Sequence, residues 1–164
     1  MLRNFVLSHL SEGVRSALRN LKWELQAMRM HRRGSRRAAQ FGGQRELKLH
    51  LGCGDNLKSG FVNIDLNSKA DLTLDLRAPL PFRDDCCCFI YSEHFLEHLE
   101  YPNVVLPLLR ECCRVLQSGG IFSAGVPDTE WPILEYARVR NDGILSAREG
   151  TMASKIVRHR DGAY

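Results

Sequence analysis

The residues best suited to bind a ligand lie between Gly52 and Asp65. Gly52, Cys53 and Gly54 directly follow one apolar run, and Asp65 closes the next apolar run, eleven positions after Gly54. Glycine lets the backbone bend and lets a ligand approach where a Cβ would intrude. A carboxylate at Asp65 can accept hydrogen bonds from the two hydroxyls of a ribose. This pattern is typical of the nucleotide-binding edge of a parallel sheet.

Further acids narrow the class of ligand. Asp55 follows the glycine turn and would repel a pyrophosphate, and a dinucleotide fold places its acid roughly twenty positions on, farther than Asp65 lies. Asp65, Asp75 and Glu93 all fall at expected carboxyl ends of strands, where such sheets bind ligands. A pocket lined by carboxylates suits a ligand that carries a ribose and a positive charge.

The elements that must position these residues follow from the apolar runs, the glycines and the prolines. The connection after the first strand is too short for a full crossover helix, and Pro79 and Pro81 exclude a helix after the third strand. Expected are strands at 47–51, 61–65, 70–75, 86–91 and 121–126, and helices at 104–116, stopped by Ser118-Gly119-Gly120, and at 130–138. We predict that residues 47–164 form an α/β domain, Rossmann-like and doubly wound, with a mostly parallel sheet and helices on both faces.

Five motifs occur in order between Leu47 and Asp128, namely HLGCG, VNID, LPF, SEHFLEHL and LQSGGIF. Together they resemble the class I S-adenosylmethionine-dependent methyltransferases, in the small-molecule branch of methyltransferase type 11. The resemblance implies that S-adenosyl-L-methionine is the cofactor. The resemblance implies that Gly52, Cys53 and Gly54 contact the methionine part of the cofactor and that Asp65 contacts its ribose. Asp75 and Leu76 would contact the adenine. Ser92, Glu93 and His94 would close over the sulfonium side.

An oxygen or nitrogen acceptor can need a base when it is methylated. His94 and His98 are the candidates, because an imidazole takes a proton near neutral pH. Structural interpretations stay open beside these roles: His98 braces the next helix, Glu93 is a helix-start carboxylate, and Asp75 is a turn residue.

The expected activity is therefore methyl transfer, with the acceptor open. A basic helix before a short first crossover looks similar to methyltransferases of cell-surface glycan assembly, which favours a sugar or polysaccharide precursor. After Asp128 no second alternating apolar run appears, so we expect a sheet that stops early and a fragment or short isoform. Two alternatives remain: an inactive module that binds the cofactor or a partner, and a nucleotide-dependent oxidoreductase.

Residues 1–46 carry ten Lys or Arg against three acids, so they hold the basic surplus behind the net charge of +4. Apolar residues at helical spacing from Phe5 and Val6 to Met28 predict an amphipathic basic helix over 1–30, followed by a cationic linker. The arginines of that linker are Arg32, Arg33, Arg36 and Arg37. Several interpretations of this segment stay open. It is a solvated tether, or it attaches to an anionic membrane surface. It is otherwise an organelle transit peptide or a contact for nucleic acid, of which the nucleic-acid contact is disfavoured.

The six cysteines form the contiguous groups Cys86-Cys87-Cys88 and Cys112-Cys113, with Cys53 apart. Neighbouring side chains chelate poorly, and no C-x2-C pair with a partner pair occurs, so we expect no metal site and no disulfide framework. We expect reduced core cysteines in a cytoplasmic protein, with membrane contact at its periphery if residues 1–46 bind lipid.

Overall fold

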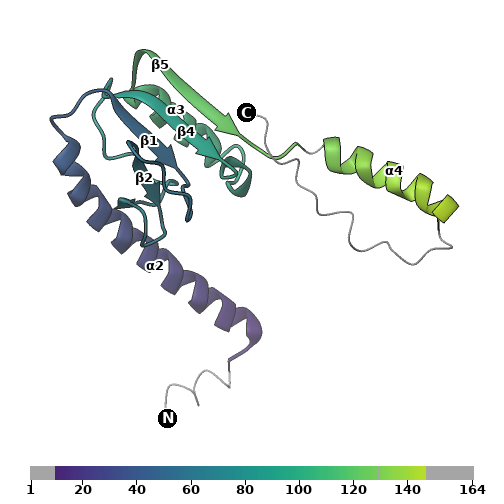
Figure 1. Cartoon of the computed structure of the whole chain (residues 1–164). Helices are drawn as coiled ribbons and strands as arrows, with labels where there is room; N and C mark the ends of the chain where they lie inside the picture. The colour runs from purple at the N-terminus through teal and green to yellow at the C-terminus, as the bar shows by residue number, and fades with distance from the viewer. Residues whose placement is uncertain (1–9, 129, 147–164) are drawn as a thin grey trace. The chain divides into compact units, whose positions relative to one another are not determined.

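The computed structural model describes residues 10–128 and 130–146, which belong to two compact units that divide after Val126 (Figure 1). The first unit contains α2 (Glu12–Ala38), the 3-10 turns η1 (Ala39–Phe41) and η2 (Leu96–His98), five strands and α3 (Val105–Val115). The second contains α4 (Glu130–Ser146). Phe5, Val6 and residues 147–164 lie outside the described residues. No described helix is long and apolar enough to cross a bilayer.

One parallel sheet forms the centre of the first unit. Its strands are β1 (Leu47–Leu51), β2 (Val62–Asp65), β3 (Leu72–Thr73), β4 (Cys87–Glu93) and β5 (Leu116–Gly125). They lie in the order β3-β2-β1-β4-β5, and every neighbouring pair is parallel. This is the strand order of the doubly wound Rossmann fold, so the predicted fold class is confirmed.

The predicted strand bounds hold best at the centre of the sheet. β1 matches the prediction, β2 begins one residue later, and β4 runs two residues further, so that Ser92 and Glu93 lie in the strand. β3 is shorter than the predicted 70–75. The strand ends at Thr73, and a turn begins at Asp75. The Asp75 carboxylate accepts the N–H of Arg77 at 3.0 Å, and the Asp75 carbonyl accepts the N–H of Ala78 at 3.1 Å.

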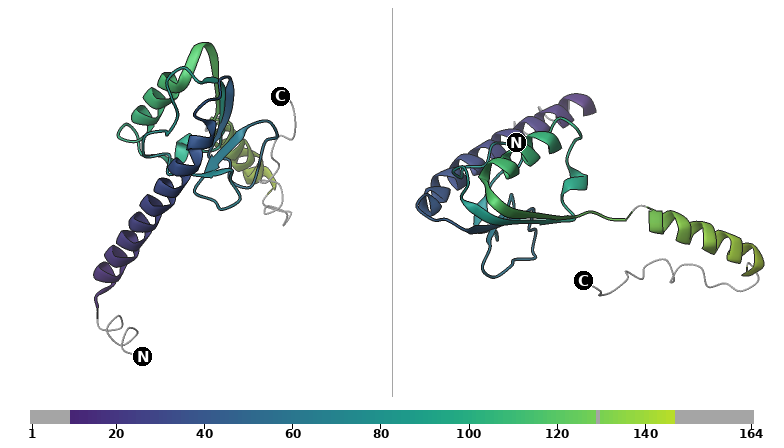
Figure 2. Two further views of the ribbon diagram at one scale, coloured as in Figure 1. Left: turned by 90° about the vertical axis from the view of Figure 1, so that its left-hand side faces the viewer. Right: turned by 90° about the horizontal axis from the view of Figure 1, so that it is seen from above.

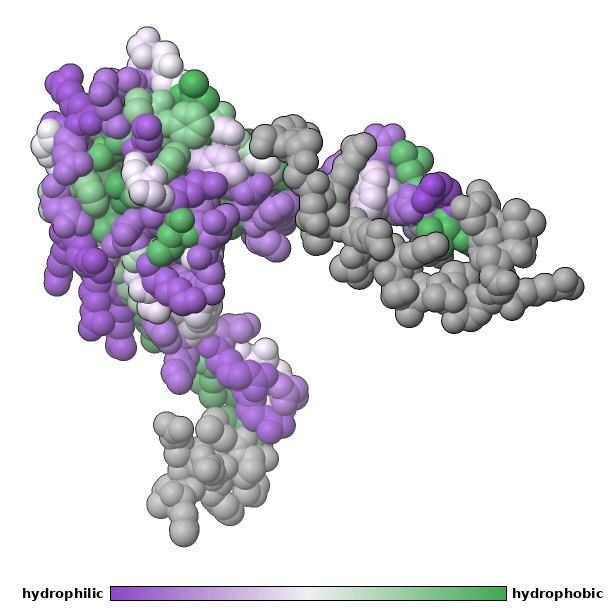
Figure 3. Space-filling view, in the orientation of Figure 1, coloured by the Kyte–Doolittle hydropathy of each residue, from purple (hydrophilic) through white to green (hydrophobic). Residues whose placement is uncertain are grey.

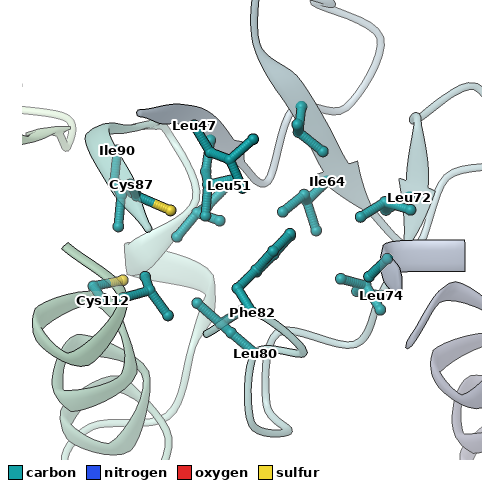
Figure 4. Packing of buried hydrophobic residues seen from close by; sticks show 14 of the residues in the cluster. Leu47, Leu51, Ile64, Leu72, Leu74, Leu80, Phe82, Cys87, Ile90 and Cys112 are labelled. Carbon is teal, nitrogen blue, oxygen red and sulfur yellow. The ribbon is translucent and has the colours of Figure 1, made fainter. Parts of the chain in front are cut away.

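The hydrophobic core lies between one face of the sheet and the helices α2 and α3 (Figure 4). Both helices lie on the same side of the sheet (Figure 2), and both contribute to one buried cluster, α2 through Ala38 and α3 through Leu108, Cys112 and Val115. We expected helices on both faces of the sheet, but α2 and α3 both cover the first face. On the second face, the described covering is the segment 52–61, where Phe61 packs against His50 and Phe89.

The predicted linker between the basic helix and the sheet was wrong, because α2 continues to Ala38. Three small residues, Ala27, Gly34 and Ala38, are the buried residues of this helix. They let α2 lie close to β3: a Cβ added to Gly34 would overlap the carbonyl oxygen of Thr73. Packing on the sheet therefore stabilises a helical segment that shows no apolar periodicity of its own.

The predicted glycine stop of the second helix was also wrong. α3 ends at Val115, and β5 begins at the next residue, so Gly119 and Gly120 lie inside the strand. The register between β4 and β5 shifts from Cys87 opposite Leu116 to Phe89 opposite Ile121. Gly119 has a φ of +78°, which accommodates this irregularity.

In the second unit, the helix predicted at 130–138 was confirmed and extends to Ser146. The Oδ1 of Asp128 accepts the backbone N–H of Glu130 at 3.0 Å, which satisfies a free donor in the first turn of the helix.

The six cysteines are free thiols, and Cys53, Cys86, Cys87 and Cys112 are buried. Burial raises the pKa of Cys112 to about 12, so this thiol stays protonated. Among the described residues, no three His, Cys, Asp or Glu side chains gather in a way that could hold a metal ion.

Candidate functional site

The strand order places the candidate site at the carboxyl ends of β1 and β4. The chain crosses from β1 to β2 and β3 on one side, and then to β4 and β5 on the other. Ligands of open parallel sheets bind in the crevice outside such a reversal. The register sets Leu51 of β1 beside Ser92 of β4, so both strands end at the same level.

The glycine turn continues the hydrogen bonding between β1 and β2. The backbone N–H groups of Gly52 and Cys53 both donate to the carbonyl of Ile64, at 2.9 and 3.2 Å. Gly52 and Gly54 have φ values of +67° and +51°, a region that favours glycine. The sequence predicted this turn because a β-carbon would be strained at either position.

Asp65 anchors the turn from the end of β2. Its Oδ2 accepts the N–H of Gly54 at 2.9 Å, and its Oδ1 accepts the N–H of Asn67 at 2.8 Å. A carboxylate has about four lone-pair positions, so Asp65 retains capacity for a ligand hydroxyl. Cys53, inside the turn, is buried; burial and the Asp65 charge raise its pKa to about 11, so it is not a thiolate.

Asp55 lies next to Asp65, because one residue, Asn67, hydrogen-bonds both carboxylates. Asn67 contacts both acids, through its backbone N–H to Asp65 and through its Nδ2 to the Oδ1 of Asp55 at 2.6 Å. The Nζ of Lys69 lies 2.8 Å from the Oδ2 of Asp55, and this hydrogen bond, with that from Asn67, lowers the pKa of the Asp55 carboxyl. Sequence reasoning missed Asn67. The signal that could have found it is the pair Asp65 and Asn67, because Asp side chains commonly accept the backbone N–H two residues later and so form a local turn.

Asp75 and Leu76 follow β3 and are both buried. The Asp75 carboxylate is held by Arg77, whose Nη2 lies 2.8 Å from Oδ2 and whose Nε lies 3.0 Å from Oδ1. Arg77 also bonds Glu24 of α2, at 2.8 and 2.9 Å. Asp75 thus links the end of β3 to α2, and its adenine role stays a prediction.

The end of β4 contributes Ser92 and Glu93. The Ser92 side chain is buried, and its Oγ has no hydrogen-bond partner among the described residues. An orphaned buried hydroxyl beside Leu51 is the kind of group that a ligand at this edge would satisfy. Glu93 is exposed, and its Oε2 accepts the hydroxyl of Tyr91 at 2.7 Å.

His94 and His98 follow β4 and are both exposed. His94 has a φ of +51°, unusual for a residue with a side chain, and its Nδ1 lies 3.6 Å from Glu97 Oε1. His98 lies in η2, where its backbone N–H donates to the carbonyl of Phe95. Both histidines therefore follow the carboxyl end of β4, at the same edge of the sheet as the glycine turn after β1.

Phe95 was not anticipated as a site residue. A Cβ added to Gly52 would overlap the Phe95 side chain, so the ring lies directly against the glycine turn. The left-handed conformation of His94 precedes this contact and turns the chain back toward β1. No feature of the sequence predicts the contact, because it joins residues from two different loops.

Behind the site, His50 is buried on the second face of β1. The Oδ1 of Asn63 accepts the N–H of Lys58 at 2.8 Å and lies 3.1 Å from the Nδ1 of His50. The Nδ2 of Asn63 donates to Asp71 at 2.8 Å, which fixes the amide orientation. Nδ1 of His50 is therefore the donor, and burial, the largest influence, lowers the pKa of this imidazole.

Comparison with the models of known families agrees with this geometry. A family described as a methyltransferase domain matches residues 49–124, from β1 to β5. A crystal structure from Methanococcus maripaludis, provisionally assigned as an S-adenosyl-L-methionine-dependent methyltransferase, is similar over 74% of this chain and 68% of its own, with 17% identity and a TM-score of 0.38. No curated protein matches the sequence.

Proposed function

Because residues 49–124 belong to the class I S-adenosylmethionine-dependent methyltransferase family, we propose that this chain methylates a hydroxyl of a sugar or polysaccharide precursor. The observation that carries the proposal is the hydrogen bond between Asp65 and Gly54 at the reversal point of the β3-β2-β1-β4-β5 sheet. It brings the glycine turn and Asp65, the acid that we propose to bind the ribose, together where such sheets bind nucleosides.

The residues at this edge fit S-adenosylmethionine. A Cβ added to Gly54 would meet nothing within 4 Å, so its backbone is open to close approach by a ligand. Asp65 keeps acceptor capacity for ribose hydroxyls, and the Ser92 hydroxyl lacks a partner among the described residues. Asp65, for which no ion pair occurs among the described residues, adds negative charge, which favours a cofactor with a sulfonium and an ammonium group.

The cofactor, when bound, supplies an electrophilic methyl group on its sulfonium. The protein mainly aligns the acceptor with that methyl group, because a correct approach lowers most of the entropic barrier of a two-substrate reaction. A sugar hydroxyl must also lose its proton. We assign that proton to His94, since the Glu97 carboxylate at 3.6 Å would stabilise the imidazolium that forms.

The first test is calorimetric titration of the full chain with S-adenosylhomocysteine and, separately, with a nicotinamide dinucleotide. We expect binding of the first ligand alone. Binding of the dinucleotide alone would overturn the proposal in favour of the oxidoreductase alternative.

The second test measures transfer of labelled methyl groups from S-adenosylmethionine to glycolipid and polysaccharide-precursor extracts. We expect label in saccharide products, and we expect His94→Gln to reduce transfer by about 100-fold or more without weakening S-adenosylhomocysteine binding. His98→Gln is the matched control, expected to retain transfer. Cofactor binding with label in no saccharide fraction would instead identify a binding module.

A further inference from the structure

One side of α2 carries a stripe of large apolar side chains that face solvent. Its members are exposed by 44 to 56% and recur every three or four residues: Val14, Leu18, Leu21, Leu25 and Met28. At 3.6 residues per turn these positions share one side of the helix. The buried residues Ala27 and Gly34 point about half a turn away, so the stripe faces away from β3. We call it the apolar stripe.

Basic residues run along one border of the apolar stripe. Arg15, Lys22 and Arg29 each follow a stripe residue by one position, and Arg33 and Arg36 continue the row. Arg15 pairs with Glu12 at 3.1 Å, while no ion pair of Lys22, Arg29, Arg33 or Arg36 occurs among the described residues. The second acid of α2, Glu24, is held by Arg77. This basic row therefore keeps most of its charge.

We propose that the apolar stripe and the basic row bind the surface of an anionic lipid bilayer. The helix would lie in the plane of the interface, with the leucines at the boundary between headgroups and acyl chains and the basic row on lipid phosphates. An apolar side bordered by Lys and Arg is what interfacial helices require. Figure 3 shows hydrophobic and hydrophilic residues side by side along α2.

A second copy of the chain fits this surface less well. The stripe spacing also resembles a coiled-coil seam, whose flanking positions normally carry opposite charges across the interface. In an antiparallel pair, the basic residues Arg15, Lys22 and Arg29 of one copy would face the same basic set of the other copy. In a parallel pair, the acid available opposite them is Glu24, which Arg77 already holds.

Nucleic acid fits less well for another reason. Phosphates would bind the basic row but would leave Leu21, Leu25 and Met28 in water, and the apolar exposure would stay unexplained.

Co-sedimentation of the full chain with vesicles tests the proposal. With phosphatidylcholine vesicles that contain phosphatidylglycerol, we expect pelleting at low salt and release at high salt, because screening weakens the attraction of the basic row. With phosphatidylcholine alone, we expect the chain to stay in the supernatant. Equal pelleting with both vesicle types would overturn the proposal.

Variants separate the two components of the surface. The double variant Leu21→Gln with Leu25→Gln should bind anionic vesicles at least about tenfold more weakly, since two side chains that would be buried in the bilayer are lost. Its matched control is Trp23→Gln: Trp23 is 49% exposed on the same helix but is turned about 200° from both leucines, so its binding should be unchanged. A double variant that binds like the parent chain refutes the role of the stripe.

A triple variant, Lys22→Gln with Arg29→Gln and Arg33→Gln, should also lose binding. A triple variant with the same loss of charge elsewhere in the first unit, Arg45→Gln with Arg83→Gln and Arg110→Gln, should keep it. If both lose binding equally, net charge rather than this surface is responsible. A concentration-dependent dimer that the double glutamine variant abolishes would instead identify a second copy as the occupant.

Discussion

The carboxylate of Asp65 accepts the backbone N–H of Gly54 at 2.9 Å, although eleven residues separate them. The acid expected to bind a ribose is thus also the group that holds the glycine turn in place. Asp65 links the end of β2 to the turn after β1, and both lie where the strand order reverses. A ligand bound there would contact a turn that is already fixed, which reduces the entropy lost on binding.

From this double role we predict that Asp65→Ala weakens S-adenosylhomocysteine binding by about 1 to 3 kcal/mol, as expected for lost hydrogen bonds to a charged group. It should also lower the free energy of unfolding, because two backbone N–H groups lose their acceptor. Titration calorimetry and urea unfolding measure the two effects. Asp55→Ala is the control: Asp55 is exposed and pairs with Lys69 at the surface, so its loss should change the free energy of unfolding little. Unchanged ligand affinity in Asp65→Ala would remove this acid from the site.

The contact between Gly52 and Phe95 gives a second prediction. Gly52→Ala meets both a φ of +67° and the Phe95 ring, whereas Gly54→Ala meets a φ of +51° and open space. Both should lose about 1 to 2 kcal/mol from the left-handed backbone, and Gly52→Ala should lose about 1 to 3 kcal/mol more from the steric overlap.

A double-mutant cycle isolates that overlap. Adding Phe95→Ala to Gly52→Ala should recover the steric part of the loss, because the ring is gone, while Phe95→Ala added to Gly54→Ala should recover nothing. Urea unfolding of the three single variants and the two double variants measures the coupling. If the losses at Gly52 simply add to those of Phe95→Ala, the ring does not pack on the turn.

The central strands and the glycine turn could be predicted because their signals are local. In β1 three leucines alternate with Lys48 and His50, and β4 begins with an apolar run from Cys87 to Tyr91, so both are recognisable as strands, and the two glycines mark a turn. The ends of elements failed where packing decides. Gly119 could end a helix or lie in an irregular strand, since both use a positive φ, and only pairing with β4 selects the second.

The parts of the site that the sequence did not reveal depend on contacts between distant residues. Arg77 joins Asp75 to Glu24, which is 53 positions away on α2. That bond forms because α2 packs on β3, and α2 packs there because Gly34 leaves room for the Thr73 carbonyl. None of these steps has a periodic pattern that would reveal it in advance.

The close packing of α2 on β3 gives a third prediction. Gly34→Ala should lower the free energy of unfolding by about 1 to 3 kcal/mol, since the new methyl group would overlap the backbone of Thr73 and the side chain of Leu74. Gly13→Ala is a matched control on the same helix, with nothing within 4 Å of its Cβ. It should stabilise the protein by roughly 0.5 kcal/mol through helix propensity. Opposite signs are the decisive result, and a stabilising Gly34→Ala would contradict the packing.

The ion pair between Arg77 and Asp75 gives the last prediction, because it makes stability depend on pH. Burial tends to raise the pKa of the Asp75 carboxyl, but the hydrogen bonds from Arg77 outweigh it and hold the pKa below its ordinary value of 3.8. A lowered native pKa stabilises the fold above the unfolded value, and that stability is lost as the pH falls through the native value. Arg77→Gln should therefore cost about 1 to 3 kcal/mol at pH 7, less than a fully buried pair because the Arg77 side chain is 38% exposed. The deficit relative to the parent chain should shrink below about pH 4, where Asp75 becomes protonated.

Urea unfolding at a series of pH values measures this deficit, with Arg83→Gln as a surface control expected to stay within about 0.5 kcal/mol of the parent. A deficit that stays constant from pH 7 to acid would mean that Arg77 stabilises α2 on β3 by packing alone.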